Sequence, residues 1–206
     1  MIRNILRFVI ILGVVGVVSG GGVAALYACF KAKIDERERL EKKQGIAAVC
    51  PEGASVDPDH PLVGNPYAPD AVYAARDPSG KVVAYVASGA SGGYSSVIQV
   101  IVGLRADDFA VLRAVVVAQA ETPGLGTQVA ETKSNYTLWE KLFGPAEPGK
   151  TERQFNPFLA RFQGKKAEEI PDIQGITAAT ISSSAAKKAV EQAIELAVQA
   201  AGAHHE

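Results

Sequence analysis

The sequence predicts an α+β protein in which one N-terminal transmembrane helix precedes a domain with an antiparallel sheet and packed helices. Three observations predict this class. An uncharged apolar run stands near the start of the chain, β-rich runs separated by turn residues fill its middle, and apolar residues with helical spacing occupy its last part. The 206 residues give room for one membrane segment and one domain of ordinary size.

The uncharged run extends from Phe8 to Phe30, which is 23 residues. At a rise of 1.5 Å per residue it forms about 35 Å of helix, enough to cross a hydrocarbon layer of about 30 Å. A cleaved signal peptide is one alternative, although its apolar core usually has about 7–15 residues. A lipoprotein signal is another, because the stretch from Leu26 to Cys29 resembles a lipobox, but Tyr27 is bulky for that motif. We therefore expect residues 1–30 to form a membrane-spanning anchor.

The charges around this run do not settle on which side of the membrane the domain lies. Arg3 and Arg7 precede the run, and six lysines and arginines follow it within residues 31–43. Positive residues favour the cytoplasmic side, which by simple counting places the domain in the cytoplasm. Acidic residues alternate with these bases, however, and large domains translocate regardless of such charge.

Residues 31–69 predict a helical extension that ends at Gly45, followed by an irregular connection rich in proline, glycine and aspartate. Four β-rich runs then predict an antiparallel meander, with a hairpin signal at Asp77-Pro78-Ser79-Gly80. The four runs are Val72–Arg76, Lys81–Ser88, Ser96–Leu104 and Val111–Ala118.

Three helices are expected after the meander. Two are short, at Tyr136–Phe143 and Phe155–Phe162. The last is the clearest, because apolar residues recur at i, i+3, i+4, i+7 and i+8. These residues are Val190, Ala193, Ile194, Ala197 and Val198, and Ser182 to Ser184 supply capping chemistry near the helix start.

Composition excludes several functions. The net charge of −1 indicates no basic face and argues against nucleic acid as a partner. Cys29 and Cys50 have no metal-binding spacing, and the three histidines form no ligand cluster, so we expect no metal site.

The segment Thr177-Ala178-Ala179-Thr180-Ile181-Ser182 combines small residues and hydroxyls directly before the last helix. A helix start presents free backbone amides and a partial positive charge, which suit a phosphate group. Taken alone, the segment also fits an ordinary cap rich in serine and threonine.

Three segments together resemble the covalent FMN-binding domain family. The segment ending at Thr180 resembles a Ser/Thr-Gly-Ala-Thr motif whose last threonine is joined to the FMN phosphate. Residues 121–126, Glu-Thr-Pro-Gly-Leu-Gly, resemble a signature of the G subunit of Rnf-type ferredoxin–NAD oxidoreductases and of the C subunit of the sodium-pumping quinone reductase. The third match is the turn Gly92-Gly93-Tyr94-Ser95. Ala178 stands where the family usually has glycine, and Gln174 stands where it has aspartate.

The resemblance implies that residues 70–206 form an FMN-binding domain with FMN linked to Thr180 by a phosphoester. It implies no catalytic side chain, because the flavin supplies the chemistry. Pro123 fixes one φ angle and Gly124 and Gly126 permit positive ones, so the signature predicts a sharp turn. The expected cofactor-binding residues are Thr177, Ala178, Ala179, Thr180, Ser182, Glu121, Thr122, Gly124, Leu125, Tyr94, Ser95 and Lys166.

Each of four side chains has an expected role toward the flavin. Thr122 would bond the polar edge of the ring, Leu125 would cover its apolar face and Tyr94 would stack on it. Lys166, with its neighbour Lys165, would place positive charge beside the phosphate or the flavin N1 and O2.

The function that the resemblance implies is electron transfer within a membrane-bound, ion-translocating oxidoreductase complex, with no independent catalysis. Integral membrane subunits and, during maturation, a flavin transferase are the implied partners. The domain would face the periplasmic side of the inner membrane. The Rnf type is preferred, and the C-type subunit of a sodium-pumping quinone reductase is the alternative within this class.

Two other functions compete with electron transfer. A flavin-free anchored structural or assembly subunit would explain the departures at Ala178 and Gln174. A hydrolase is suggested by Gly89-Ala90-Ser91-Gly92-Gly93, which satisfies G-x-S-x-G. That motif requires a helix directly after the serine and a histidine later in the chain, and here a strand is expected to follow.

Overall fold

The computed structural model describes residues 2–134 and 154–203. It separates into two compact units, one ending at Glu41 and one beginning at Lys42. Helix α1 extends over Ile2–Val49, and its part up to Glu41 forms the first unit. Its apolar stretch has a mean hydropathy of 2.4, and its side chains are exposed, so by length and composition this helix can cross a membrane. The helix expected at 136–143 lies outside the described residues.

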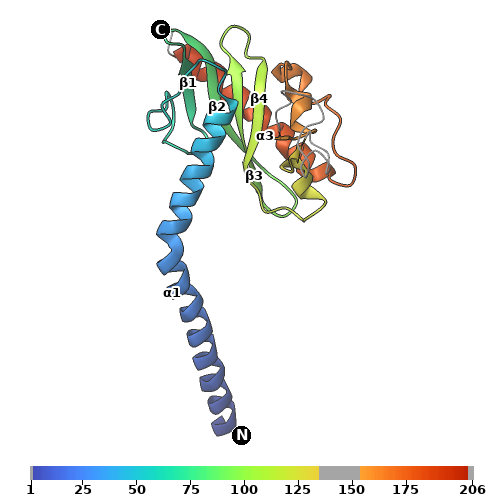
Figure 1. The fold of residues 1–206 in the computed structure, drawn as a ribbon. Coiled ribbons are helices and arrows are strands. Elements are labelled where there is room, and N and C mark those ends of the chain that lie inside the picture. Colours follow the sequence, from blue (N-terminus) through green and yellow to red (C-terminus); the bar gives the residue numbers. More distant parts are fainter. Residues whose placement is uncertain (1, 135–153, 204–206) are drawn as a thin grey trace, which may run out of the picture. The chain divides into compact units, whose positions relative to one another are not determined.

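The second unit is built on an antiparallel sheet with the strand order β1-β2-β3-β4 (Figure 1). The strands are β1 (Val72–Arg76), β2 (Val82–Gly92), β3 (Val97–Arg105) and β4 (Val111–Ala118). This arrangement confirms the predicted meander. The hairpin signal between β1 and β2 also forms a turn, in which the Gly80 amide donates to the Asp77 carbonyl at 2.9 Å.

One face of the sheet packs against α3 (Thr180–Ala203). Alternate side chains of β3, including Val100 and Val102, face this helix because successive residues of a strand point to opposite faces. The apolar face of α3 continues through Ala197 to Ala200 and Ala201. The prediction that Val198 belongs to this face is wrong, because Val198 lies beyond its border and is 46% exposed.

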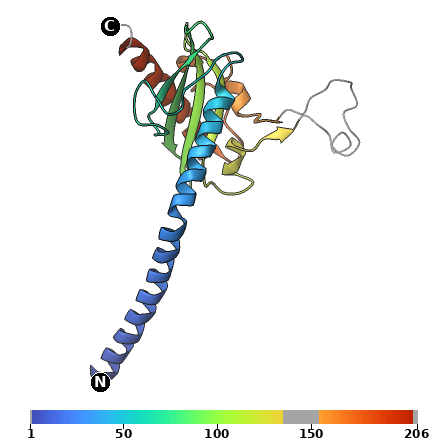
Figure 2. The same ribbon diagram turned by 60° about the vertical axis from the view of Figure 1, so that its left-hand side comes forward.

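The last turns of α1 cover the opposite face of the sheet (Figure 2). Ile46 and Val49 pack there in a second core cluster. The prediction that Gly45 ends the helix is wrong. Gly45 instead allows close packing, since a Cβ at this position would lie 2.5 Å from Cγ1 of Val117. The helix ends shortly before Pro51, whose ring disfavours helical backbone at the preceding residue.

The connection between α1 and β1 is irregular, as expected, and it covers the outer edge of the sheet. Isolated bridges join Ser55 to Arg76 and Val63 to Val72. These backbone contacts use polar groups of β1 that an uncovered edge strand would expose.

A two-stranded ladder, β5 (Lys133–Ser134) and β6 (Gln154–Phe155), follows β4 in the chain. The helix expected at 155–162 is reduced to a short 3₁₀ turn, η2 (Leu159–Phe162). Buried Asn156 explains the late start, because its Oδ1 accepts from the amides of Phe158 and Leu159 at 2.8 Å each. Its Nδ2 lies 3.2, 3.0 and 2.8 Å from the carbonyl oxygens of Gln128, Val129 and Glu131, at the end of η1 (Gly126–Val129) and just after it, and its two hydrogens are shared among them.

Gly89 and Gly92 provide a matched test of the packing between β2 and α3. A Cβ at Gly89 would lie 1.9 Å from the Ala189 carbonyl oxygen, whereas one at Gly92 would meet nothing within 4 Å. We expect Gly89→Ala to lower the free energy of unfolding by about 2 kcal/mol or more, because helix and strand must separate. Gly92→Ala should leave it nearly unchanged. Urea denaturation of both variants measures the difference, and equal effects would contradict this packing.

Candidate functional site

The Glu121 carboxylate joins three segments that are distant in the sequence. It accepts hydrogen bonds from the amides of Tyr94, Ser95 and Ser96 at 3.2, 3.0 and 2.9 Å. It also accepts from the hydroxyl of Ser96 at 3.2 Å and from that of Ser182 at 2.7 Å. The β2–β3 turn, the segment after β4 and the start of α3 therefore meet at this side chain. These are the three segments that carry the sequence motifs.

Glu121 is only 5% exposed, yet it is held in the charged form. Burial by itself would raise the pKa of Glu121. The hydrogen bonds from Ser182 and from the amides of Ser96, Ser95 and Tyr94 outweigh burial and lower this pKa to about 2. A buried carboxylate with this many donors is a fixed anion that orients the three segments around it.

Two motif glycines allow the backbone to approach this carboxylate. A Cβ at Gly93 would lie 2.5 Å from Oε1 of Glu121, and one at Gly126 would lie 2.7 Å from its Oε2. Of the two glycines in the 121–126 signature, only Gly124 has a positive φ, at 74°. The expectation that Gly126 serves a positive φ is therefore wrong. Gly126 is required because the space beside it is filled by Glu121 and the Ser182 hydroxyl.

Thr180 is the first residue of α3, and its side chain is exposed. The first backbone bond into this helix runs from the Ser183 amide to the Ala179 carbonyl at 2.9 Å. The amides of Thr180, Ile181 and Ser182 precede that bond, and the first amides of a helix have no partner within it. The Thr180 hydroxyl thus lies at the positive end of the helix dipole, where a phosphate group is stabilised.

Ala178 has a φ of 65°, in the left-handed region. This is the position at which the related motif usually has glycine. The methyl group of alanine makes left-handed backbone unfavourable by about 1–2 kcal/mol. The segment therefore keeps the backbone shape that glycine would adopt, at a cost in energy. Thr177 and Ala178 are exposed beside Thr180, and Ala179 is buried.

The turn at Pro123–Gly124 is held by two side chains of η1, which follows it. The Gly124 amide donates to Oγ1 of Thr127 at 3.0 Å, and the Gly124 carbonyl accepts from Nε2 of Gln128 at 2.7 Å. The polar groups of Gly124 are thus already engaged. Thr122 and Leu125 remain exposed in this turn and are available to a ligand.

Large apolar side chains are exposed on each of the three joined segments. Tyr94 is 71% exposed, Val97 60%, Leu125 45% and Ile181 54%. Outside α1, exposed side chains of this size are few among the described residues, so their occurrence on these segments is informative. The side chain of Ser95 is also exposed there, while its amide is bonded to Glu121.

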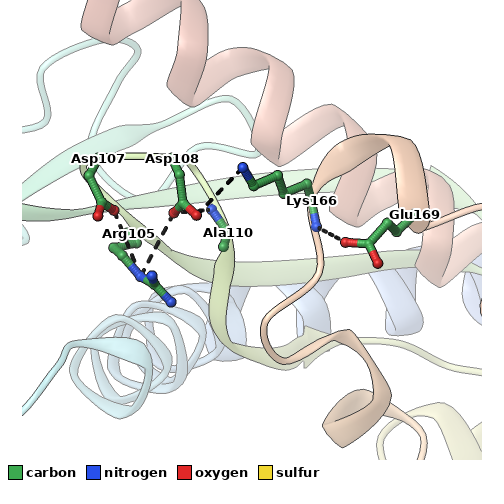
Figure 3. Close-up of polar contacts among 6 residues, drawn as sticks. All are labelled: Arg105, Asp107, Asp108, Ala110, Lys166 and Glu169. Carbon is green, nitrogen blue, oxygen red and sulfur yellow. Dashed lines mark hydrogen bonds and ion pairs between the residues drawn. The ribbon is translucent and has the colours of Figure 1, made fainter.

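Lys166 is not brought to this group. Its Nζ lies 3.6 Å from Oδ2 of Asp108, which belongs to the β3–β4 turn, as Figure 3 shows. Successive turns of a meander lie at opposite ends of the sheet, so Lys166 and Glu121 are at different ends. The reason is local pairing, because the Val111 amide at the start of β4 donates to the Lys165 carbonyl at 2.9 Å. Exposed ion pairs of this kind contribute little to stability.

The structure also rules against the nucleophile elbow. Ser91 lies within β2, where it pairs with Ile98 of β3, and no helix follows it. Ser96 is a site residue that the sequence interpretation missed. Its hydroxyl donates to Glu121 and accepts from the Ala120 amide at 2.7 Å. Its place beside Ser95 in the turn motif was the available signal.

Comparison with known proteins identifies the family to which the chain is similar. Residues 93–195 match the FMN-binding domain family. The G subunit of the ion-translocating oxidoreductase complex of Pseudomonas aeruginosa, in strains UCBPP-PA14 and PAO1, is 30% identical over 175 residues, which cover 79% of this chain and 80% of that protein. The G subunit of the same type of complex from Methanosarcina acetivorans is 26% identical over 135 residues, which cover 62% of this chain and 69% of that protein. The crystal structure of NqrC from Shewanella oneidensis has a TM-score of 0.45 and 18% identity, covering 75% of this chain and 71% of that one.

Glu121→Gln should remove the fixed anion and make stability less sensitive to acid. Because the pKa of Glu121 is lower in the folded protein than its ordinary 4.5, its charge stabilises the fold above pH 4.5. That stabilisation disappears as the pH falls toward about 2. We expect Glu121→Gln to cost about 3 kcal/mol at pH 7 and to flatten the dependence between pH 4.5 and 2.5.

Denaturant unfolding of the detergent-solubilised chain at several pH values measures this effect. Glu195→Gln, which changes an exposed glutamate of α3, is the matched control and should follow the parent chain. If Glu121→Gln unfolds with the same pH dependence as the parent chain, the charged state of Glu121 does not stabilise the fold.

Ala178→Gly should stabilise the chain. Glycine adopts a φ of 65° without the penalty that a Cβ brings, and we expect a gain of about 1 kcal/mol after the entropy cost of glycine. Ala179→Gly, one residue later, is the control and should destabilise, because it removes a buried methyl group. Thermal unfolding compares the two. A loss of stability in Ala178→Gly would show that the left-handed conformation carries no strain.

Proposed function

Because this chain belongs to the FMN-binding domain family, together with the G subunits of ion-translocating oxidoreductase complexes, we propose that it carries FMN esterified to Thr180 and transfers electrons within such a complex. A redox role in a membrane complex follows from the relatives, whose names describe complex subunits. The covalent link and its position are our proposal.

The observation that carries the proposal is the exposed Thr180 hydroxyl in the first turn of α3. An ester at this oxygen would place the phosphate charge beside the amides of Ile181 and Ser182, where the helix dipole favours an anion. The helix start can therefore stabilise the phosphate without a charged side chain. This arrangement fits a covalently held phosphate better than a freely exchanging one, because the position is open to solvent.

The exposed apolar side chains support a bound aromatic ring. Tyr94, Leu125 and Ile181 lie on segments fixed by Glu121, so a ring attached through Thr180 would find apolar side chains in nearby parts of the fold. Thr122 offers a hydroxyl to the polar atoms of such a ring. When bound, the flavin supplies the electron transfer, while these residues orient it and keep water from its apolar face.

The partners would be integral membrane subunits of the same complex, and a flavin transferase would act during maturation. The relatives are named as G subunits, which favours this type over the C-type subunit of a sodium-pumping quinone reductase. The apolar stretch of α1 would anchor the chain as a single pass in the plasma membrane. We propose that the domain faces the periplasm.

A flavin-free structural subunit is the second candidate, and Ala178 and Gln174 favour it because both depart from the attachment motif. Mass spectrometry of the protein produced with a flavin transferase separates the two functions. We expect the peptide containing Thr180 to gain the mass of FMN less one water, and Thr180→Val to abolish the gain.

Thr180→Ser is the matched variant, because it keeps a hydroxyl at the same place and should still accept the group. An unmodified Thr180 peptide in the parent chain, under conditions that label a known flavoprotein, would favour the structural subunit.

A further inference from the structure

The segment that leads to Thr180 is held by two cationic side chains. We define residues 171–179 as the acceptor loop. Nη1 of Arg161 donates to the Gln174 carbonyl at 2.7 Å. Nζ of Lys187 donates to the carbonyls of Pro171 and Ile173, at 2.8 and 3.1 Å. One cation comes from η2 and the other from α3, so the loop is fixed from two separate elements.

In these contacts a charged donor binds backbone carbonyls. A hydrogen bond with a charged donor is about twice as strong as a neutral one. Among the described residues, neither Arg161 nor Lys187 forms an ion pair with a carboxylate, so their charges are directed at the loop carbonyls alone. Both side chains bind backbone carbonyls, so they restrain the backbone of the loop and not its side chains.

The loop has a conformation that needs such support. Ala178 is left-handed, with a φ of 65°, and Gly175 lies so close to α3 that a Cβ would be 2.8 Å from Oγ of Ser183. A strained backbone persists only where the surrounding contacts over-determine it. Without the cations, alanine at position 178 would favour relaxation of the loop to ordinary backbone angles, and Thr180 would shift with it.

We propose that Arg161 and Lys187 are positioning residues that hold the acceptor loop, with its left-handed Ala178, in the shape from which Thr180 is flavinylated. This inference rests on the proposed attachment of FMN at Thr180. It explains how a chain with alanine in place of the motif glycine keeps an acceptor threonine in position. The two cations provide through contacts what glycine provides through its backbone freedom.

The reaction to be measured joins the Thr180 oxygen to the phosphorus of FMN. Ester formation from free FMN would release water and is unfavourable in water, so the donor must be an activated anhydride. FAD, the anhydride of FMN with AMP, belongs to this class. The bond between the Thr180 oxygen and phosphorus forms as the phosphorus–oxygen bond to AMP breaks. AMP leaves, the hydroxyl proton is released, and no electron is transferred.

The test measures the rate of flavin incorporation into the full chain in detergent, with FAD and a purified flavin transferase, by intact mass. We expect Arg161→Met and Lys187→Met each to slow incorporation about tenfold, the factor that one charge-assisted hydrogen bond provides. Arg161→Lys and Lys187→Arg keep a cationic donor and should restore most of the rate. Lys188→Met, at an exposed neighbour on the same helix, should have no effect.

Ala178→Gly distinguishes a positioning role of the two cations from a purely structural one. Glycine needs no support at this φ, so adding Ala178→Gly to Arg161→Met or Lys187→Met should restore incorporation, as coupled sites do in a double-mutant cycle. Rates are measured well below the unfolding temperature of every variant, so that loss of global stability does not contribute.

The outcomes separate this inference from the function on which it rests. If the parent chain takes up no flavin at Thr180, the proposed function fails. If the parent chain is labelled and the two methionine variants are labelled equally fast, only the positioning role is overturned. If the variants are slow and Ala178→Gly does not restore them, the link between the cations and the strained alanine is overturned.

Discussion

The buried charge of Glu121 is the interaction on which the rest of the site depends. Without it, nothing in the hydrogen bonding of the described residues joins the β2–β3 turn directly to the start of α3. An anion that accepts from three backbone amides and two hydroxyls leaves little freedom to the segments that supply them. Gly93 and Gly126 are consequences of this constraint, since any larger residue would collide with the carboxylate.

Much of the fold could be predicted from local patterns. Strands β1 to β4 are bounded by turn residues, and α3 has a clear helical repeat, so periodicity was sufficient. The errors occurred where a distant contact decided the outcome. Gly45 resembles a helix terminator, but Val117 packs against it and the helix continues. The start of η2 was misplaced because Oδ1 of Asn156 accepts from the amides of Phe158 and Leu159, and the side chain is held in this place by carbonyls more than twenty residues away in the chain.

The site was predicted less completely than the fold. The motifs located Thr180 and the turn around Gly124, whose positive φ a glycine beside proline indicates. The motifs did not show that the Glu121 carboxylate accepts hydrogen bonds from within the protein, because its donors lie in other segments of the chain. Lys166 was chosen for the charge that it would place beside the phosphate or the flavin, which does not tell where the residue lies. Strand pairing takes it to the other end of the sheet from Glu121, where it contacts Asp108.

The packing of α1 on the sheet has a consequence for how this protein can be divided. Ile46 and Val49 complete the second core cluster with Tyr73, Val86 and Ile101, although they belong to the same helix that contains the apolar stretch. A soluble fragment that begins at the first strand would leave this cluster open to water. A chimaera that exchanges the apolar part of α1 must therefore have its junction upstream of Lys42, where the second compact unit begins. The final turns of the helix then stay with the domain.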